Sequence, residues 1–273
     1  MSKGQTWISA DWHGCWDPAY KVLNFLQPDD TFYFLGDAID RGPDGIKILE
    51  ALMNRPNTFF IKGNHEDMML KNLPFMIKDL KEIYCFEIER YPCQEWFSNG
   101  AWKTIENGLV GKSIEDLSKY ENFLNKLPLQ LEYYSPKGYT IILEHAGYTP
   151  FNFFYRHKYS HDPLWDRRHF YDEWNHSNDP ELENVYLIHG HTPVQYLKYF
   201  YGYKDQPPKT KEDIADARLW NSNEYKKCSK PTILHYCSNH KIDIDMCTIA
   251  SGRIALLNLD TFEEIYFDKG DNK

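Results

Sequence analysis

The stretch that decides the fold is Thr31-Phe-Tyr-Phe-Leu35 followed by Gly36-Asp-Ala-Ile-Asp-Arg-Gly42. A five-residue apolar run is typical of a buried strand, and the polar loop between two glycines ends that strand. Apolar residues at Ile46, Leu49 and Leu52 then recur at the spacing of one helix face. The stretch therefore predicts a strand, a polar loop and a helix in succession.

The same order occurs on both sides of this stretch. Upstream, Thr6–Ala10 precedes the loop Asp11-Trp-His-Gly14, and Pro18 is suited to open a helix. Downstream, Thr58–Ile61 precedes Gly63-Asn-His-Glu66. Repeated strand–loop–helix units predict a parallel sheet, because parallel strands need such crossovers. Ligands of open α/β sheets bind beyond the carboxyl ends of the strands, so the polar loops are expected to meet at one edge.

The segment 67–127 has a mostly helical pattern. Pro74, Pro92 and Asn99-Gly100 are expected to break it into several helices. We interpret the segment as a helical cap inserted into the α/β domain.

The rest of the chain predicts further strands. Leu129–Tyr134 and Tyr139–Glu144 flank a Pro-Lys-Gly turn and predict a hairpin, and Val185–Ile188 predicts a strand that ends in His-Gly-His-Thr. A polar segment, 204–230, predicts an exposed loop. Three strand-like runs close the chain, at 232–236, 253–259 and 264–268. No internal repeat or linker is evident, so we expect one elaborated domain over 1–273.

Composition excludes several classes of function. The net charge is −9, from 31 Lys and Arg against 40 Asp and Glu, which argues against stable, sequence-independent binding of nucleic acid. No run approaches the roughly 18 apolar residues of a membrane span, and the start lacks the apolar core of a signal peptide. The six cysteines form no CxxC pair and are too sparse for a disulfide scaffold. A cytoplasmic protein is expected, with its oligomeric state left open.

Residues with metal-binding chemistry gather in the strand-end loops. They are Asp11, His13, Asp37, Asp40, Arg41, Asn64, His65, His145, His189 and His191. Taken singly, an Asp-x-His-Gly is a common turn and a lone histidine is more often a core residue. Five such clusters after five separate strands favour a shared site. Imidazole and carboxylate ligands without thiolate suit Mn, Fe or Zn, and two divalent ions on two carboxylates would leave a positive site for a phosphate dianion.

The order of the clusters resembles one family. The series is Asp11-x-His13-Gly14, Gly36-Asp37-x-x-Asp40-Arg41-Gly42, Gly63-Asn64-His65-Glu66, His145-Ala-Gly147 and Gly190-His191-Thr192. It resembles the phosphoprotein phosphatase family of calcineurin-like metallophosphoesterases, and most of all the small bacterial and phage-type serine/threonine phosphatases. The resemblance implies an α/β fold of two packed mixed β-sheets flanked by helices. It also implies two divalent metal ions, with Mn as the first candidate and Fe, Zn and Ni as alternatives.

The resemblance implies a metal ligand at each matching position. Asp11 and His13 are expected to hold the first metal, and Asp37 is expected to bridge both. The second metal is expected on Asn64, His145 and His191, and Asn64 is also expected to contact substrate phosphate.

It further implies residues that act on the substrate. His65 would be the general acid, with Asp40 orienting its ring, and Arg41 would bind phosphate oxygens. Leu164-Trp-Asp-Arg167 fits a Leu-Trp-x-Arg segment that carries a second phosphate-binding arginine in related small enzymes, which favours Arg167 over Arg168. The alternative for Arg167 is a surface ion pair with a neighbouring aspartate.

The motifs leave the substrate open. We expect hydrolysis of phosphomonoesters, first of phosphoserine and phosphothreonine in proteins, with phosphotyrosine also in reach, by direct attack of a hydroxide that bridges the metals. The alternative is a symmetrical dinucleoside tetraphosphate (Ap4A) hydrolase or another nucleotide phosphoesterase, and a non-catalytic binding protein ranks last. The aromatic stretch from Tyr148 to Trp174 could stack a nucleobase, but packing in a small second core is the more ordinary interpretation.

The C-terminal part departs from the family pattern and contains a decoy. The family usually has Asp-Thr-Gly followed by a Gly-Gly pair, whereas here Asp245-Met-Cys247 precedes Ser251-Gly252. Cys247 and Arg253 also match the Cys-x5-Arg spacing of cysteine-dependent tyrosine phosphatases. We reject that interpretation because the residues from Arg253 onward predict a strand, whereas a phosphate loop of that kind opens a helix.

Overall fold

The computed structural model describes residues 4–82, 91–147, 162–167, 182–195 and 230–270, and the description below concerns these residues. Ten strands form two five-stranded mixed sheets in the described residues. The first sheet has the order β10-β9-β1-β2-β3, with β1 Thr6–Ser9, β2 Thr31–Phe34, β3 Thr58–Phe60, β9 Arg253–Asn258 and β10 Glu264–Asp268. The second has the order β4-β5-β6-β8-β7, with β4 Gln130–Tyr134, β5 Thr140–Glu144, β6 Val185–His189, β7 Leu234–Tyr236 and β8 Lys241–Asp243.

The strands that carry the polar loops are parallel, as the sequence predicts. β1 pairs with β2, and β2 with β3, in parallel, with Trp7 opposite Phe32 and Phe32 opposite Thr58. In the second sheet β5, β6 and β8 are parallel, while β4 and β7 form the antiparallel edges. The predicted hairpin over β4 and β5 is confirmed. The carboxyl ends of five parallel strands, β1, β2, β3, β5 and β6, can therefore contribute to one site.

Two hydrophobic cores lie on the two faces of the first sheet. Side chains alternate across a strand, so neighbouring residues such as Trp7 and Ile8 in β1 enter different cores. Ile8 packs between the sheets with residues of the second sheet, including Ile141 and Ile188, which confirms the predicted pair of packed sheets. Trp7 packs under the helices, in a core that also takes in Trp96.

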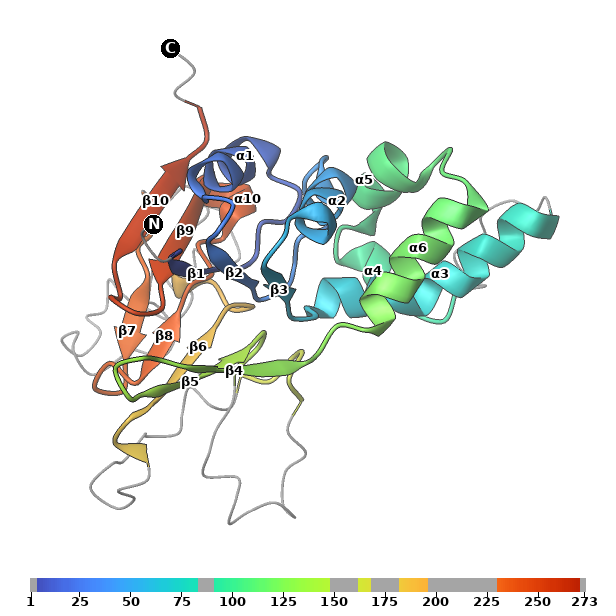
Figure 1. Ribbon diagram of the computed structural model, residues 1–273. Coiled ribbons are helices and arrows are strands. Elements are labelled where there is room, and N and C mark those ends of the chain that lie inside the picture. Colours follow the sequence, from blue (N-terminus) through green and yellow to red (C-terminus); the bar gives the residue numbers. More distant parts are fainter. Residues whose placement is uncertain (1–3, 83–90, 148–161, 168–181, 196–229, 271–273) are drawn as a thin grey trace, which may run out of the picture.

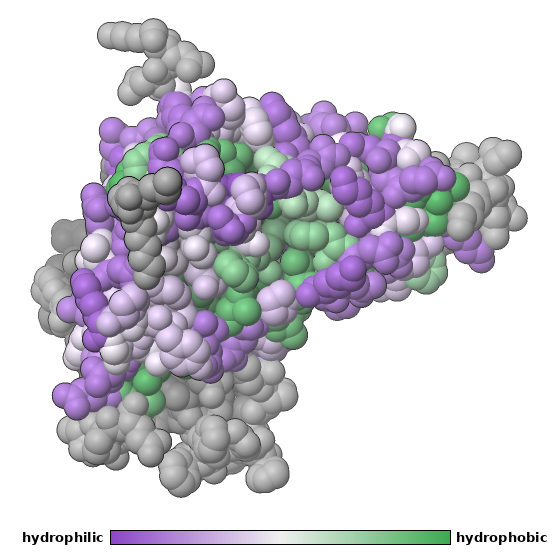
Figure 2. Space-filling view, viewed as in Figure 1, coloured by the Kyte–Doolittle hydropathy of each residue, from purple (hydrophilic) through white to green (hydrophobic). Residues whose placement is uncertain are grey.

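Helices cover the outer face of the first sheet and extend beyond it (Figure 1). α1 Trp16–Phe25 and α2 Gly45–Asn54 connect the parallel strands, and the short α10 Thr248–Ser251 precedes β9. We call the next group the cap helices: α3 Asn64–Glu82, α4 Glu95–Ser98, α5 Ala101–Thr104, the π-helical turn Ile105–Leu109 and α6 Ile114–Asn125. They project to one side of the sheets, and apolar surface gathers between the two parts, beside β3 (Figure 2). None of the helices in the described residues is both long and apolar enough to cross a membrane.

The structure corrects the sequence-based prediction at two places. Pro74 does not break the helix but lies inside α3, with its side chain exposed. The helix continues because Met69, Leu73 and Met76 on its other face are buried in the core. The sequence also missed the three-residue strand β8 and the short helix α10.

Two predicted segments lie wholly or mostly outside the described residues. They are the exposed loop 204–230 and the aromatic stretch from Tyr148 to Trp174, of which residues 162–167 are described.

Candidate metal and phosphate site

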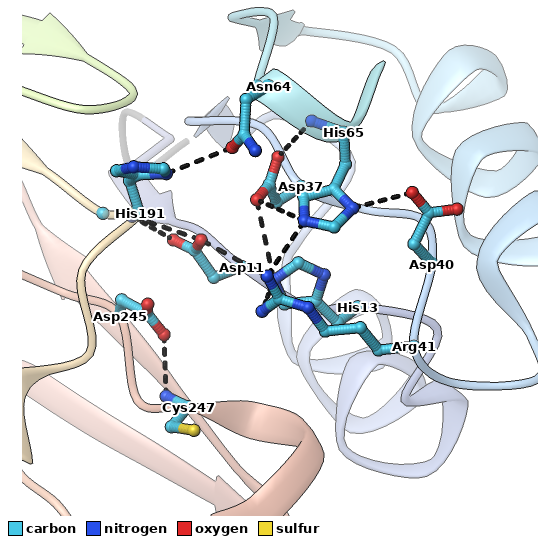
Figure 3. A network of polar contacts seen from close by, with 12 residues as sticks. Asp11, His13, Asp37, Asp40, Arg41, Asn64, His65, His191, Asp245 and Cys247 are labelled. Carbon is cyan, nitrogen blue, oxygen red and sulfur yellow. Dashed lines mark hydrogen bonds and ion pairs between the residues drawn. The ribbon is translucent and has the colours of Figure 1, made fainter. Parts of the chain in front are cut away.

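The predicted site residues converge at the carboxyl ends of the strands (Figure 3). Asp11 and His13 follow β1, Asp37 follows β2, and His145 follows β5. Six site residues have left-handed backbone conformations: Asp11 (φ 56°), His13 (42°), Asp37 (61°), Asp40 (68°), Arg41 (65°) and His191 (67°). Such conformations cost non-glycine residues on the order of 1–3 kcal/mol each and cluster at functional sites.

Glu66 holds two of these loops together, a role that the sequence did not reveal. Its Oε2 accepts hydrogen bonds from the backbone N–H of Asp37 (2.7 Å) and of Gly63 (3.0 Å), and its Oε1 accepts one from Ala38 (2.9 Å). Burial, together with the charge of Asp37, raises the pKa of Glu66 to about 7. Its place after the Gly-Asn-His motif was the only signal in the sequence.

A first group of potential ligands joins His13, Asp37 and His65. Their donor atoms lie within 4.8 Å of one another, and all three side chains are buried. Nε2 of His13 is 3.6 Å from Asp37 Oδ2, and Nε2 of His65 is 3.8 Å from the same oxygen. Nδ1 of His13 donates to the carbonyl of Ile39 (3.0 Å), so the lone pair of Nε2 faces the group.

A second group joins Asp37, His145 and His191, again within 4.8 Å. Nδ1 of His145 donates to the carbonyl of Leu35 (2.7 Å), which leaves its Nε2 unprotonated, 3.5 Å from Asp37 Oδ1. Asn64 Oδ1 lies 2.9 Å from that Nε2 and 3.1 Å from Nδ1 of His191. A carbonyl oxygen and a ring nitrogen that both carry lone pairs suit a shared cation.

Asp11 stands beside both groups. Its Oδ1 is 4.0 Å from Nε2 of His13, and both of its oxygens accept the backbone N–H of His191 (3.2 and 3.1 Å). The compact first group contains His65 in its place, so the pairing of Asp11 with His13 on one ion stays a prediction. Burial, and then the charges of Asp245 and Asp37, raises the pKa of Asp11 well above its usual value.

The charges and orphaned atoms of the site fit divalent metals. Burial lowers the pKa of His13, His145 and His191, so the rings are neutral ligands near pH 7. Burial alone would raise the pKa of Asp37, but at the acidic pH where this carboxyl titrates the neighbouring histidines, His145 first, carry positive charge, and together with Arg41 they hold the pKa below its usual range. Nε2 of His191 is buried without a hydrogen-bond partner. The site thus combines a buried carboxylate, neutral imidazole rings and one ring nitrogen without a hydrogen-bond partner. Such a set of donor atoms suits Mn, Fe or Zn better than Mg.

The predicted pair of His65 and Asp40 is present. Nδ1 of His65 donates to Asp40 Oδ2 at 2.7 Å, and both side chains are buried. Nε2 of His65 therefore points toward Asp37 and the groups of potential metal ligands, away from Asp40 (Figure 3). The guanidinium of Arg41 spans two rings, with Nη1 2.9 Å from Nε2 of His13 and Nη2 3.0 Å from Nε2 of His65.

Arg167 lies at the rim of the site, and Arg168 lies outside the described residues. Its Nε donates to Oγ1 of Thr192 (3.0 Å), and its charge contributes to the lowered pKa of His191. Trp165, two residues earlier, packs its ring perpendicular to that of His191, with centroids 5.7 Å apart. Arg167 is exposed and has no carboxylate partner among the described residues. The surface ion pair with a neighbouring aspartate stays an alternative, because residues 168–181 lie outside the described part of the chain.

His189 is a core residue, the more ordinary of the two interpretations. Its Nδ1 bonds to the carbonyl of Gly190 and its Nε2 to the hydroxyl of Tyr236 (2.6 Å), and burial lowers its pKa to about 3. Neither metal-binding group includes it.

The C-terminal turn that departs from the family pattern contains a residue with a left-handed backbone conformation. Cys247 takes the glycine position with φ 50°, and its N–H donates to Asp245 Oδ1 at 2.7 Å. Arg253 binds Asp268 through Nε (2.6 Å) and Nη2 (2.9 Å) in β9 and β10. A strand position and an occupied guanidinium argue against a phosphate loop built on Cys247 and Arg253.

Comparison with known families agrees with the geometry. The sequence model of the calcineurin-like phosphoesterase family matches residues 5–217. A symmetrical bis(5'-nucleosyl)-tetraphosphatase of Legionella pneumophila (strain Philadelphia 1) is 35% identical over 235 residues, which cover 84% of this chain and 66% of that protein.

Other relatives match over shorter segments. Serine/threonine-protein phosphatase 1 of Salmonella typhimurium is 39% identical over 67 residues, 23% of this chain and 31% of that protein. A symmetrical bis(5'-nucleosyl)-tetraphosphatase of Wigglesworthia glossinidia brevipalpis is 36% identical over 80 residues, 28% of this chain and 29% of that protein. These matches therefore span less than a third of either relative.

A solved structure shares the fold. The cold-active protein-tyrosine phosphatase of a Shewanella species has a TM-score of 0.52 and 16% identity, and covers 96% of this chain and 77% of that one. At this identity the likeness concerns the fold alone.

Proposed function

Because the chain belongs to the calcineurin-like phosphoesterase family, we propose that it is a metal-dependent phosphatase that hydrolyses phosphomonoesters, first of all phosphoserine and phosphothreonine in proteins. The observation that carries this proposal is the pair of buried ligand groups that share Asp37, next to the bonded pair of His65 and Asp40. Two divalent ions, with Mn as first candidate, would be held by Asp11, His13, Asp37, Asn64, His145 and His191. When bound, they would supply Lewis-acid stabilisation and lower the pKa of a coordinated water.

His65 is the residue placed to protonate the leaving group. Nδ1–H of His65 donates to Asp40, so Nε2 is the atom that faces the site. In this structure Nε2 accepts from Nη2 of Arg41, and it can hold a proton for the departing oxygen when Arg41 binds the phosphate instead. Nε2 also lies within 4 Å of Asp37, where a substrate phosphate would meet the metals. General-acid assistance of this kind is typically worth about 10²–10⁴-fold.

Two arginines would orient the phosphate. Arg41 stands between His13 and His65 and offers a planar fork of donors that matches phosphate oxygens. Arg167 approaches from the His191 side and keeps its guanidinium exposed. Both side chains recognise the phosphoryl group and not the group attached to it, which supports a phosphatase of loose specificity.

Symmetrical dinucleoside tetraphosphate hydrolysis is the second candidate. A specific observation favours it, since the match to the Legionella tetraphosphatase extends over 84% of this chain, whereas the matches to protein phosphatases are short. The ligand set and the phosphate-binding arginines would serve either reaction.

A substrate panel tests the proposal. We would load the protein with Mn and compare phosphoserine, phosphothreonine and phosphotyrosine peptides with diadenosine tetraphosphate and a 2′,3′-cyclic nucleotide, using Asp37→Asn as the control. We expect hydrolysis of the phosphopeptides that is lost in the control. Cleavage of diadenosine tetraphosphate that is orders of magnitude more efficient would reverse the ranking, and no hydrolysis of any substrate by metal-loaded protein would favour a binding protein.

We also propose that the enzyme works in a reducing compartment, the cytoplasm. Among the described residues, Cys15 and Cys93 carry reduced thiols, which supports this expectation.

A further inference from the structure

The cap helices supply two hydrogen-bond donors to the carboxylate of Asp40. Oδ2 of Asp40 accepts both Nδ1–H of His65 (2.7 Å) and Nε1–H of Trp96 (2.8 Å), and Oδ1 accepts the hydroxyl of Thr104 (2.6 Å). Trp96 lies in α4 and Thr104 ends α5. The side chains of all four residues are buried, with exposures of 0–1%. Both oxygens of Asp40 are thus occupied, and only one of the three donors comes from the catalytic pair itself.

The same cap segment fixes the backbone of the Asp40–Arg41 loop. Oγ1 of Thr104 accepts the N–H of Asp40 (2.9 Å), and the carbonyl of Gly100 accepts the N–H of Arg41 (3.1 Å). Both residues have positive φ values, a conformation that needs support from its surroundings. A Cβ on Gly100 would lie 3.0 Å from the backbone N of Arg41, so the segment also approaches this loop closely.

We propose that Trp96 and Thr104 are positioning residues of the phosphatase reaction, which hold Asp40 so that it keeps the ring of His65 aligned. The inference rests on the proposed function of His65 as general acid. A carboxylate with a single partner can rotate about its terminal torsion, whereas donors on both oxygens fix its plane. The hydrogen bond to Nδ1 of His65 then has one fixed direction, and Nε2 stays oriented toward the oxygen atom of the leaving group.

Each donor can be removed with little change in volume. Trp96 also packs in the core, where its ring lies 5.8 Å from that of Phe97, so a large truncation would test packing. Trp96→Phe removes Nε1–H and keeps an aromatic ring, and Thr104→Val removes the hydroxyl at nearly constant shape. Trp102→Phe is the matched control, because Trp102 lies in the same segment, is 44% exposed and shows no bond to Asp40.

The kinetic test compares two leaving groups in Mn-loaded protein. An alkoxide such as serine needs a proton as the bond breaks, whereas a nitrophenolate needs it less. We expect Trp96→Phe and Thr104→Val to lower kcat on a phosphoserine peptide about 10-fold. On p-nitrophenyl phosphate the loss should stay below about 3-fold, with metal content unchanged. Thr104→Ser keeps the hydroxyl, so it should restore the wild-type ratio of kcat on the phosphoserine peptide to kcat on p-nitrophenyl phosphate. The Trp102→Phe control should leave this ratio unchanged.

A double-mutant comparison shows whether Trp96 acts through His65. In a His65→Asn background there is no general acid to align. Trp96→Phe should therefore lower kcat on the phosphoserine peptide by less than about a further 2-fold. Equal losses on both substrates, or full additivity in the His65→Asn background, would show that Trp96 serves only to support the fold.

A spectroscopic readout judges the positioning without any catalysis. In ¹⁵N spectra of zinc-loaded protein, with His65 assigned from the His65→Asn variant, we expect Nδ1 to stay protonated and bonded to Asp40, both in the neutral ring and in the doubly protonated ring that acts as the acid. Trp96→Phe and Thr104→Val should give a mixture of tautomers or a shifted Nδ1–H signal. Unchanged spectra would overturn the positioning role. If the wild type hydrolyses no phosphoester, the proposed function fails, while these spectra still decide whether the two side chains align His65.

Discussion

At the scale of single residues, the partner of each histidine Nδ1 separates ligands from the proposed acid. His13 and His145 donate Nδ1–H to backbone carbonyls, and burial lowers the pKa of both, so each presents a neutral lone pair at Nε2. His65 donates Nδ1–H to the carboxylate of Asp40 instead. A carboxylate stabilises the protonated ring, whereas a carbonyl mainly orients the neutral one. His65 is therefore placed to give up a proton, although its ring also belongs to the first group of potential ligands.

The first prediction separates these two roles. Asp37→Asn removes the charge that both ligand groups share, so it should cost metal occupancy and activity toward every substrate. His65→Asn should keep the metals and lose about 10²–10⁴-fold on a phosphoserine peptide, with a smaller loss on p-nitrophenyl phosphate. Asp40→Asn should show the same bias in milder form. Metal content by elemental analysis and kinetics on both substrates decide the matter, and loss of metal from His65→Asn would place His65 among the ligands.

The second prediction concerns Arg41. Its two terminal nitrogens reach His13 and His65 at the same time, a geometry that the single ammonium of lysine cannot reproduce. Arg41→Lys should therefore raise KM for phosphopeptides and lower kcat/KM by about 10–100-fold, on the order of 1–3 kcal/mol. Arg167→Lys should cost less, because Arg167 is exposed and binds only Thr192 in the described residues. Equal effects of the two substitutions would contradict this ranking of the arginines.

At the scale of secondary-structure elements, tertiary contacts determine the hydrogen-bond partners and the helix boundaries that local sequence patterns do not predict. The strands and polar loops around Asp37 were predictable because each carries a strong local pattern. Glu66, Trp96 and Thr104 were not, because their partners Asp37 and Asp40 lie 29–64 residues away along the chain. Local sequence offers no signal for such bonds. The predicted break at Pro74 was wrong for the same reason, since packing of the neighbouring turns outweighed the local preference.

The third prediction uses that proline. Pro74 lies inside α3 with its ring exposed, where it has no N–H for the helical bond to the carbonyl of Leu70. Pro74→Ala should raise the free energy of unfolding by about 1–2 kcal/mol, since the regained helical bond exceeds the entropy that proline removes from the unfolded chain. Thermal unfolding measures this, with the exposed neighbour Phe75→Ala as control. Lower stability of Pro74→Ala would mean that α3 needs the proline.

At the scale of the whole molecule, the site depends on both sheets and the cap together. The first sheet supplies Asp11 and Asp37, the second supplies His145 and His191, and the cap helices bind Asp40. The edge of the first sheet was predictable because three strand–loop–helix units repeat there. The arrangement of the second sheet was not, because β8 is three residues long and its buried Lys241 and Asp243 hide the apolar pattern of a strand. His189 likewise shares the strand-end pattern of the ligands but binds Tyr236 in the core.

The fourth prediction concerns pH. Burial raises the pKa of Asp245 and of Glu66 to about 7, so these two carboxyls hold protons at mildly acidic pH. Burial also raises the pKa of Asp11 above its usual value, which acts in the same direction. Bound cations favour the ionised carboxylates, so metal binding should release protons and tighten as pH rises through this range, by up to about 10-fold per pH unit for each proton. Mn titrations at pH 6 and 8 measure the change. Asp245→Asn should weaken the dependence, and equal affinity at both pH values would contradict the prediction.

The fifth prediction is that metal removal destabilises the whole fold. The ligands come from both sheets, and without cations the buried charge of Asp37 lies among neutral imidazoles, Arg41 and the carboxyl groups of Asp11 and Glu66. Ligands that bind only the folded state stabilise by mass action, about 2.7 kcal/mol at a concentration 100 times Kd. For a chain of this size that corresponds to a rise in Tm of about 5–10 °C. Chelation should therefore lower Tm and abolish activity, and Mn should restore both better than Mg, because imidazole is a poor ligand for Mg. In Asp37→Asn most of the Mn-induced rise should be missing. The same Tm with and without chelator, in protein shown to contain metal beforehand, would mean that the ions do not join the two sheets.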